Sequence, residues 1–112
     1  MYKRQDTFKR ISDIVEFSAE KMKKNGVFET ERLFCDVYCF EVGQSQSVHT
    51  HEGSDKVYFV VEGRGLFRIG AERRELGKGE VALAPSGEPH GVENPGPEQL
   101  KLLVVMAPRP SH

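Results

Sequence analysis

The chain has 112 residues, the length of one domain with a single hydrophobic core. Hydrophobic residues make up 38%, charged residues 29% and the formal net charge is -1, so we expect neither disorder nor a strongly basic nucleic-acid-binding face. The longest apolar runs, Val57–Val61 and Leu102–Ala107, fall far short of the roughly 20 residues that span a bilayer. No nucleic-acid or membrane partner is therefore expected.

The first ten residues carry charges with no apolar segment behind them, which does not fit a signal peptide. We therefore expect a cytoplasmic location. Residues 1–32 have weak patterning, and we assign them to an N-terminal arm that packs on a single domain of residues 33–112. Ser18–Lys24 is compatible with a helical turn that Asn25-Gly26 would end, and a strand arm covering the barrel fits equally well.

From Leu33 onward, short runs rich in Val, Phe, Tyr, Ile and Leu alternate with Gly, Pro, Asn and Ser. Strands without intervening helices are typical of an antiparallel sandwich or barrel. The eight expected strands lie near residues 33–42, 46–51, 56–62, 65–70, 73–76, 80–84, 90–93 and 100–107. The predicted fold class is therefore all-β and antiparallel.

Two cysteines, Cys35 and Cys39, fall in the first of these strands. Four residues of strand place them on one face, about 13 Å apart. A disulfide requires Cα atoms within about 7 Å, so we expect no bridge and interpret both as small buried hydrophobic side chains.

The first chemical signal is His49-Thr50-His51. Alternate residues of a strand face the same side, so both imidazoles would face one side of the sheet. Two close imidazoles form half of a metal site of a kind that suits Zn, Fe, Cu and Ni. The pair alone is weak evidence, because such pairs are also common as structural or incidental features.

Two longer stretches give the pair a context. Gly43–His51 with Glu62-Gly63 resembles the first motif of the cupin superfamily, and Gly79–Asn94 resembles its second motif at every defined position. The first motif departs at one place, where Lys56 stands in the position of the motif's glutamate. The resemblance implies a small single-domain cupin, whose fold is a double-stranded β-helix, or jelly-roll, barrel.

The resemblance also implies a metal site. It assigns His49, His51 and His90 as ligands of a divalent transition metal, with Zn, Fe, Mn, Ni or Cu as the alternatives. The turn Pro85-Ser86-Gly87 would bring His90 back onto the face of the other two histidines. The fourth histidine, His112, is the last residue, where we expect disorder.

The lysine is the difficulty for this assignment. A divalent ion and an ammonium group about 4–5 Å apart repel by roughly 7 kcal/mol at an effective dielectric of about 20. A filled site therefore requires Lys56 to turn outward or lose its proton, or a shifted loop to supply Asp55 or Glu52 as fourth ligand. Otherwise the site holds no metal, and Lys56 binds an anionic ligand.

These alternatives define the functional predictions. A three-histidine metal is a strong Lewis acid, so the first hypothesis is a metal-binding cupin that acts on or binds a small polar molecule, as an oxygenase or isomerase would. Lys56 and Tyr58 are the catalytic candidates near the metal. The alternative is a non-catalytic binding or sensing cupin, with or without a metal. Fold alone cannot choose between them.

Strand alternation also predicts the oligomeric state. If Lys56 faces inward, Tyr58 and Val60 do so too, and Val57, Phe59 and Val61 face outward. In cupins such outer faces commonly pack against a second subunit. We therefore expect a homodimer.

Overall fold

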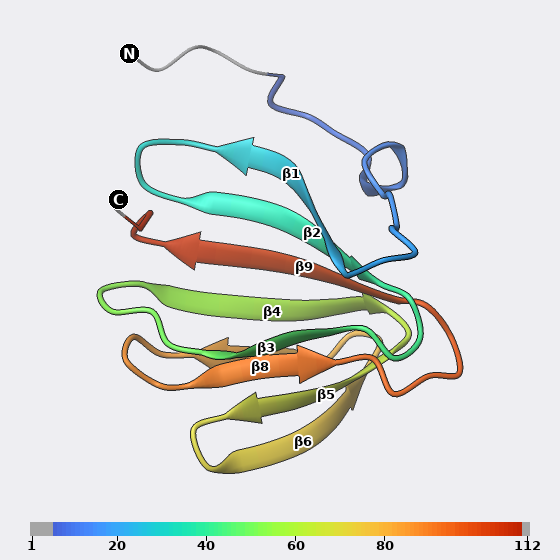
Figure 1. Ribbon diagram of the computed structural model, residues 1–112. Coiled ribbons are helices and arrows are strands. Elements are labelled where there is room, and N and C mark those ends of the chain that lie inside the picture. The colour runs from blue at the N-terminus through green and yellow to red at the C-terminus, as the bar shows by residue number, and fades with distance from the viewer. Residues whose placement is uncertain (1–5, 111–112) are drawn as a thin grey trace.

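The apolar runs of the sequence pair into two antiparallel sheets in the computed structural model, which describes residues 6–110 (Figure 1). One sheet has the strand order β1-β2-β9-β4-β7 and the other β3-β8-β5-β6. The elements are η1 (Ile11–Asp13), β1 (Lys23–Glu29), β2 (Phe34–Phe40), β3 (Ser45–His49), β4 (Asp55–Glu62), β5 (Arg64–Ile69), β6 (Glu72–Gly77), β7 (Val81–Ala84), β8 (His90–Glu93) and β9 (Leu100–Ala107). His112 lies outside the described residues.

This architecture confirms the predicted all-β, antiparallel jelly roll. Each of the eight expected strands is present, with ends within two residues of the prediction. The two sheets face each other around one core, whose largest fully buried apolar side chains include Tyr58, Phe40 and Phe67. Within the described part of the chain, no helix is both long enough and apolar enough to cross a membrane.

Strand β4 shows how alternation builds the interior. Lys56, Tyr58 and Val60 are buried, whereas Val57 and Phe59 are exposed, as the sequence predicted. Strand β4 thus places Lys56, the residue that departs from the motif, in the space between the sheets. Both cysteines are free, as expected; Cys39 is fully buried, whereas Cys35 is only partly buried, so the interpretation as a buried side chain holds for Cys39 alone.

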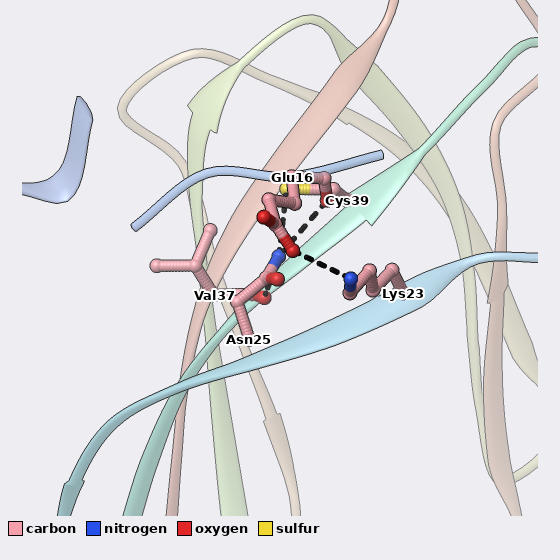
Figure 2. Close-up of polar contacts among 5 residues, drawn as sticks. All are labelled: Glu16, Lys23, Asn25, Val37 and Cys39. Atoms are coloured by element: carbon pink, nitrogen blue, oxygen red, sulfur yellow. Dashed lines mark hydrogen bonds and ion pairs between the residues drawn. The ribbon is translucent and has the colours of Figure 1, made fainter. Parts of the chain in front are cut away.

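The N-terminal segment joins the sheet as a strand. Of the two alternatives for Ser18–Lys24, the helical turn is wrong, because the chain there is irregular until β1 begins and pairs with β2. Buried Asn25 explains the outcome, since its side-chain amide donates to the carbonyl oxygens of Glu16 and Val37 at 3.0 and 3.3 Å (Figure 2). A helix ending at Asn25 would leave these buried groups without partners.

The same network fastens the segment that precedes β1. The Nζ of Lys23 lies 2.6 Å from a carboxylate oxygen of Glu16, and the Asn25 amide also reaches Cys39 Sγ at 3.4 Å (Figure 2). Apolar side chains of this segment then pack on the outer face of the five-stranded sheet. They include Ile11, Ile14, Val15 and Phe17, which contact the cluster of Val27, Val37 and Cys39.

The other half of that outer face is uncovered. Val57 is paired across strands with Leu83, and Phe59 with Val81, so four apolar side chains form one patch on β4 and β7. Each of the four is at least 40% exposed. We propose that a second copy of the chain covers this patch, since monomers seldom expose contiguous apolar surface of this kind.

The patch predicts a dimer that a single charge disrupts. Light scattering should give twice the chain mass of 12.6 kDa for the wild type and the monomer mass for Leu83→Lys. Val48→Lys, at an exposed valine of the other sheet, is the matched control and should leave the dimer intact. A monomeric wild type across micromolar concentrations would contradict the proposal.

Candidate functional site

Three histidines from two different motifs meet at one end of the four-stranded sheet. His49 ends β3 and is the cross-strand partner of His90, which begins β8, while His51 follows two residues beyond the end of β3. The ring centroids are 4.8 Å apart for His49 and His51, 4.3 Å for His49 and His90, and 5.6 Å for His51 and His90. One nitrogen of each ring lies within 4.8 Å of the others, a spacing that a single metal ion can bridge.

Backbone carbonyls orient two of the rings. His49 Nδ1 lies 2.7 Å from the Ser47 carbonyl oxygen, and His90 Nδ1 lies 2.9 Å from that of Glu88. A ring nitrogen facing a carbonyl carries the proton, which leaves Nε2 with its lone pair free to bind a metal.

The donor set therefore fits a transition metal. His90 Nε2 is buried and has no hydrogen-bond partner among residues 6–110, a costly arrangement unless a ligand completes it. Burial lowers the pKa of His49, His51 and His90 below the ordinary value, and the nearby Lys56 lowers each further. All three rings are thus neutral at neutral pH, the form that coordinates metals.

Lys56 faces this cluster from β4. The side chain is 1% exposed, and its Nζ lies 5.0 Å from the Tyr38 ring centroid and 5.1 Å from that of Tyr58. Its hydrogen-bond acceptor is Gln46 Oε1 at 3.4 Å, and within the described residues it forms no ion pair with a carboxylate. Burial, with a smaller contribution from Lys24, lowers the Lys56 pKa to about 7.

Of the ways to reconcile Lys56 with a metal, the geometry favours loss of its proton. The side chain does not turn outward, and an amine with a pKa of about 7 is neutral in about half of the molecules at pH 7. A metal at the histidines would lower that pKa further, because it repels the ammonium form. The repulsion of several kcal/mol that the sequence predicts between the metal and Lys56 is therefore avoided when Lys56 loses its proton.

The two carboxylates considered as a fourth ligand lie elsewhere. Asp55 is exposed and accepts a hydrogen bond from the Ser86 amide at 2.9 Å. Glu52 is also exposed, with its carboxylate near Gly87. The structure brings neither into the histidine cluster that it forms from the described residues.

Tyr58 lies inside the site but is a weak candidate for a base. Its hydroxyl donates to Gln46 Oε1 at 3.4 Å, and its ring meets the His90 ring edge-on with centroids 6.3 Å apart. Burial raises the Tyr58 pKa far above the ordinary value, so the hydroxyl stays protonated. Of the two catalytic candidates, only Lys56 changes protonation near neutral pH.

A cavity of about 500 Å³ opens beside the cluster and is lined mainly by residues of β1 and β2. His51 belongs to its wall, which also includes Lys24, Asp36, Tyr38 and Met106. Asp36 is half-buried; burial raises its pKa, and the two lysines, Lys24 and Lys56, oppose that rise. The cavity wall therefore combines the amine of Lys24, the carboxyl groups of Asp36 and Glu29, and His51 from the histidine cluster.

Sequence reasoning missed the wall residues Lys24, Asp36, Tyr38 and Met106, which lie outside the two motifs. One signal was present for Asp36, a charged residue within the otherwise apolar run Phe34–Phe40, where alternation places it on the same face as Tyr38. No comparable signal marks Lys24, because its segment was compatible with either a helix or a strand.

Comparison with known proteins identifies the family and agrees with the fold. The family model described as a cupin domain matches residues 36–106. The crystal structure of TT1209 from Thermus thermophilus has 47% sequence identity and a TM-score of 0.89, covering 92% of this chain and 98% of that chain. The oxalate-binding protein of Thermotoga maritima is 31% identical over 88 residues, covering 79% of this chain and 72% of that protein. A Methanocaldococcus jannaschii protein of uncharacterised function is 38% identical over 71 residues, covering 63% of this chain and 57% of that protein.

The burial of Lys56 predicts an unusual pH dependence of stability. The unfolded chain holds the proton up to about pH 10.5, whereas the folded chain releases it near pH 7, so the free energy of unfolding should rise with pH between these values. At about 1.4 kcal/mol per pKa unit, the rise is on the order of 4 kcal/mol. Denaturant unfolding of metal-free protein near pH 6 and near pH 10 measures it.

Lys56→Met should remove this rise and stabilise the fold near pH 6, because no charge is then buried. Lys101→Met is the control, since Lys101 is paired with Glu62 outside the site and should keep the wild-type pH dependence. An equal pH dependence for the wild type and Lys56→Met would show that Lys56 has an ordinary pKa.

Proposed function

The chain belongs to the cupin domain family, and from that membership we propose that it binds a divalent transition metal through His49, His51 and His90 and uses it to bind or transform a small carboxylate-bearing molecule. One observation carries the proposal. The buried Nε2 of His90 has no partner among residues 6–110 and lies beside two further neutral imidazoles. A metal ion would satisfy all three nitrogens at once.

The chemistry of the donors suits Zn, Fe, Mn, Ni or Cu. Three neutral ligands leave the full charge on the ion, which when bound acts as a Lewis acid that polarises a carboxylate or carbonyl oxygen. The carbonyl groups of Ser47 and Glu88 orient the rings of His49 and His90. The buried side chains of Tyr38 and Tyr58 exclude water from the site.

A metal at the histidines would favour an anionic ligand. The ion would add two positive charges beside the cavity, whose wall carries Lys24 and two carboxyl groups, Asp36 and Glu29. A small carboxylate would offset the charge of the metal. The Thermotoga relative is by name an oxalate-binding protein, which makes a small dicarboxylate the first ligand to test.

If the protein is an enzyme, Lys56 is the residue best placed to act as a base. Its neutral amine lies beside the histidine cluster, and proton abstraction next to a polarised carboxylate is isomerase chemistry. This favours the isomerase over the oxygenase alternative.

A second function has support from one specific observation, the absence of a carboxylate paired with Lys56 in the described part of the chain. In that case Lys56 is protonated and binds the anion directly. The chain is then a metal-free binding or sensing module.

The first test is metal content and affinity. Protein made without a histidine tag should carry close to one transition-metal ion per chain by elemental analysis. His49→Ala should lower the affinity for zinc by at least about 100-fold, because one of three ligands is lost. Thr50→Ala, an exposed neighbour between the two histidines, is the matched control and should bind as the wild type does.

Oxalate titration by calorimetry then separates the two functions. The metal proposal requires that chelation abolish oxalate binding. Binding that survives chelation but is lost in Lys56→Met would establish the metal-free alternative instead. Folded protein that carries no metal after growth in metal-replete medium, and binds none in vitro, would refute the metal site.

A further inference from the structure

The metal site does not require an amine at position 56. Lysine is almost never fully buried without a partner, because an unpaired charge in the interior is costly. Yet Lys56 is 1% exposed, lies between two tyrosine rings, and has no carboxylate within ion-pairing distance among residues 6–110. Lysines that are desolvated in apolar pockets include the nucleophiles of some enzymes.

We propose that Lys56 is a nucleophile that forms a Schiff base with a small aldehyde or keto acid. The assignment of a carboxylate to this ligand rests on the proposed function, whereas the reactivity of the amine does not. The Nζ lone pair bonds to the carbonyl carbon, and one proton passes from the nitrogen to the carbonyl oxygen, which gives a carbinolamine. Loss of water then forms the C=N bond, so that amine and carbonyl are converted to imine and water without an oxidant or reductant.

The surroundings of Lys56 match the two ways in which proteins activate a lysine, desolvation and a neighbouring cation. Tyr38 and Tyr58 exclude water from the amine, and both rings lie within about 5 Å of it. Lys24 supplies the cation: its Nζ lies 5.4 Å from the centroid of the same Tyr38 ring. The lowered pKa of Lys56, to about 7, has burial as its first cause and Lys24 as its second.

The reacting carbonyl has a place beside the amine. Lys56 is the cross-strand neighbour of Met106, and its Nζ lies over Tyr38; both of these residues line the cavity of about 500 Å³. The Met106 side chain is unbranched and flexible, and its rotation to another rotamer would connect the Lys56 amine with this cavity. On the other side, Gln46 contacts the amine and lines a second cavity, of about 700 Å³, that Lys24 also borders.

Two further residues of the wall complete the chemistry. Asp36 carries a half-buried carboxyl group whose pKa burial raises, which suits the transfer of a proton to the departing oxygen. Lys24 faces the same cavity as a cation and would hold the ligand's carboxylate. The Lys56 amine, the Asp36 carboxyl group and the Lys24 amine together would suit a ligand whose carbonyl carbon is close to a carboxylate, as in glyoxylate.

Reductive trapping tests the proposal on the wild-type protein. Glyoxylate with cyanoborohydride converts a Schiff base into a stable secondary amine, which peptide mass spectrometry locates. At pH 7, Lys56 should be modified at least about tenfold faster than Lys101, which is ion-paired with Glu62. The rate at Lys56 should level off above neutral pH. Labelling of Lys56 no faster than Lys101 near both pH 7 and pH 9 would overturn the proposal.

Matched variants test the role of the wall. Formaldehyde is an uncharged carbonyl, so the ratio of glyoxylate to formaldehyde labelling at Lys56 measures the contribution of the carboxylate. Lys24→Met should lower this ratio, and Lys23→Met, whose lysine pairs with Glu16, should not. Repeating the labelling after chelation separates the two proposals, because a nucleophilic Lys56 still reacts with formaldehyde when no metal is bound. Equal ratios in Lys24→Met and wild type would remove Lys24 from the assignment.

Discussion

The structure of the site depends on one constraint, the burial of the Lys56 amine between the two sheets, opposite three histidines. A charged ammonium in that place is unfavourable, both because it has lost its water and because Lys24 repels it. The amine lies against the faces of Tyr38 and Tyr58 and has one long hydrogen bond to Gln46, and in these surroundings the neutral form is tolerated. The same neutrality is what allows a metal ion to sit nearby.

Two pieces of sheet geometry place these groups. Pairing of β3 with β8 brings His49 beside His90, although the two residues lie far apart in the chain. The position of β4 in the other sheet points Lys56 and Tyr58 at them from across the barrel. Strand β1, which lies beside β2 at the edge of its sheet (Figure 1), adds Lys24 to the cavity wall. The site therefore belongs to the space between the sheets rather than to either motif.

The strands from residue 33 onward and the meeting of the three histidines followed from the sequence, because alternation and turn residues are local signals and the two motifs have fixed spacings. The N-terminal strand did not, since its local pattern suits helix and strand alike and the choice is made by the contacts of Asn25 with residues 16, 37 and 39. Asp55, one residue before Lys56, and Glu52 are candidate ligands only if the loop is shifted, but in the structure Asp55 accepts a hydrogen bond from the Ser86 amide instead. The state of Lys56 was also beyond the sequence, because its pKa depends on burial among side chains from other strands.

The measurement that tests this account most directly is a nitrogen-15 NMR titration of the Lys56 side chain, with Lys56→Met used for assignment. The account predicts a midpoint near pH 7 in the metal-free protein and a lower midpoint once zinc is added. A midpoint near the ordinary lysine value of about 10.4, or one that zinc does not move, would contradict it.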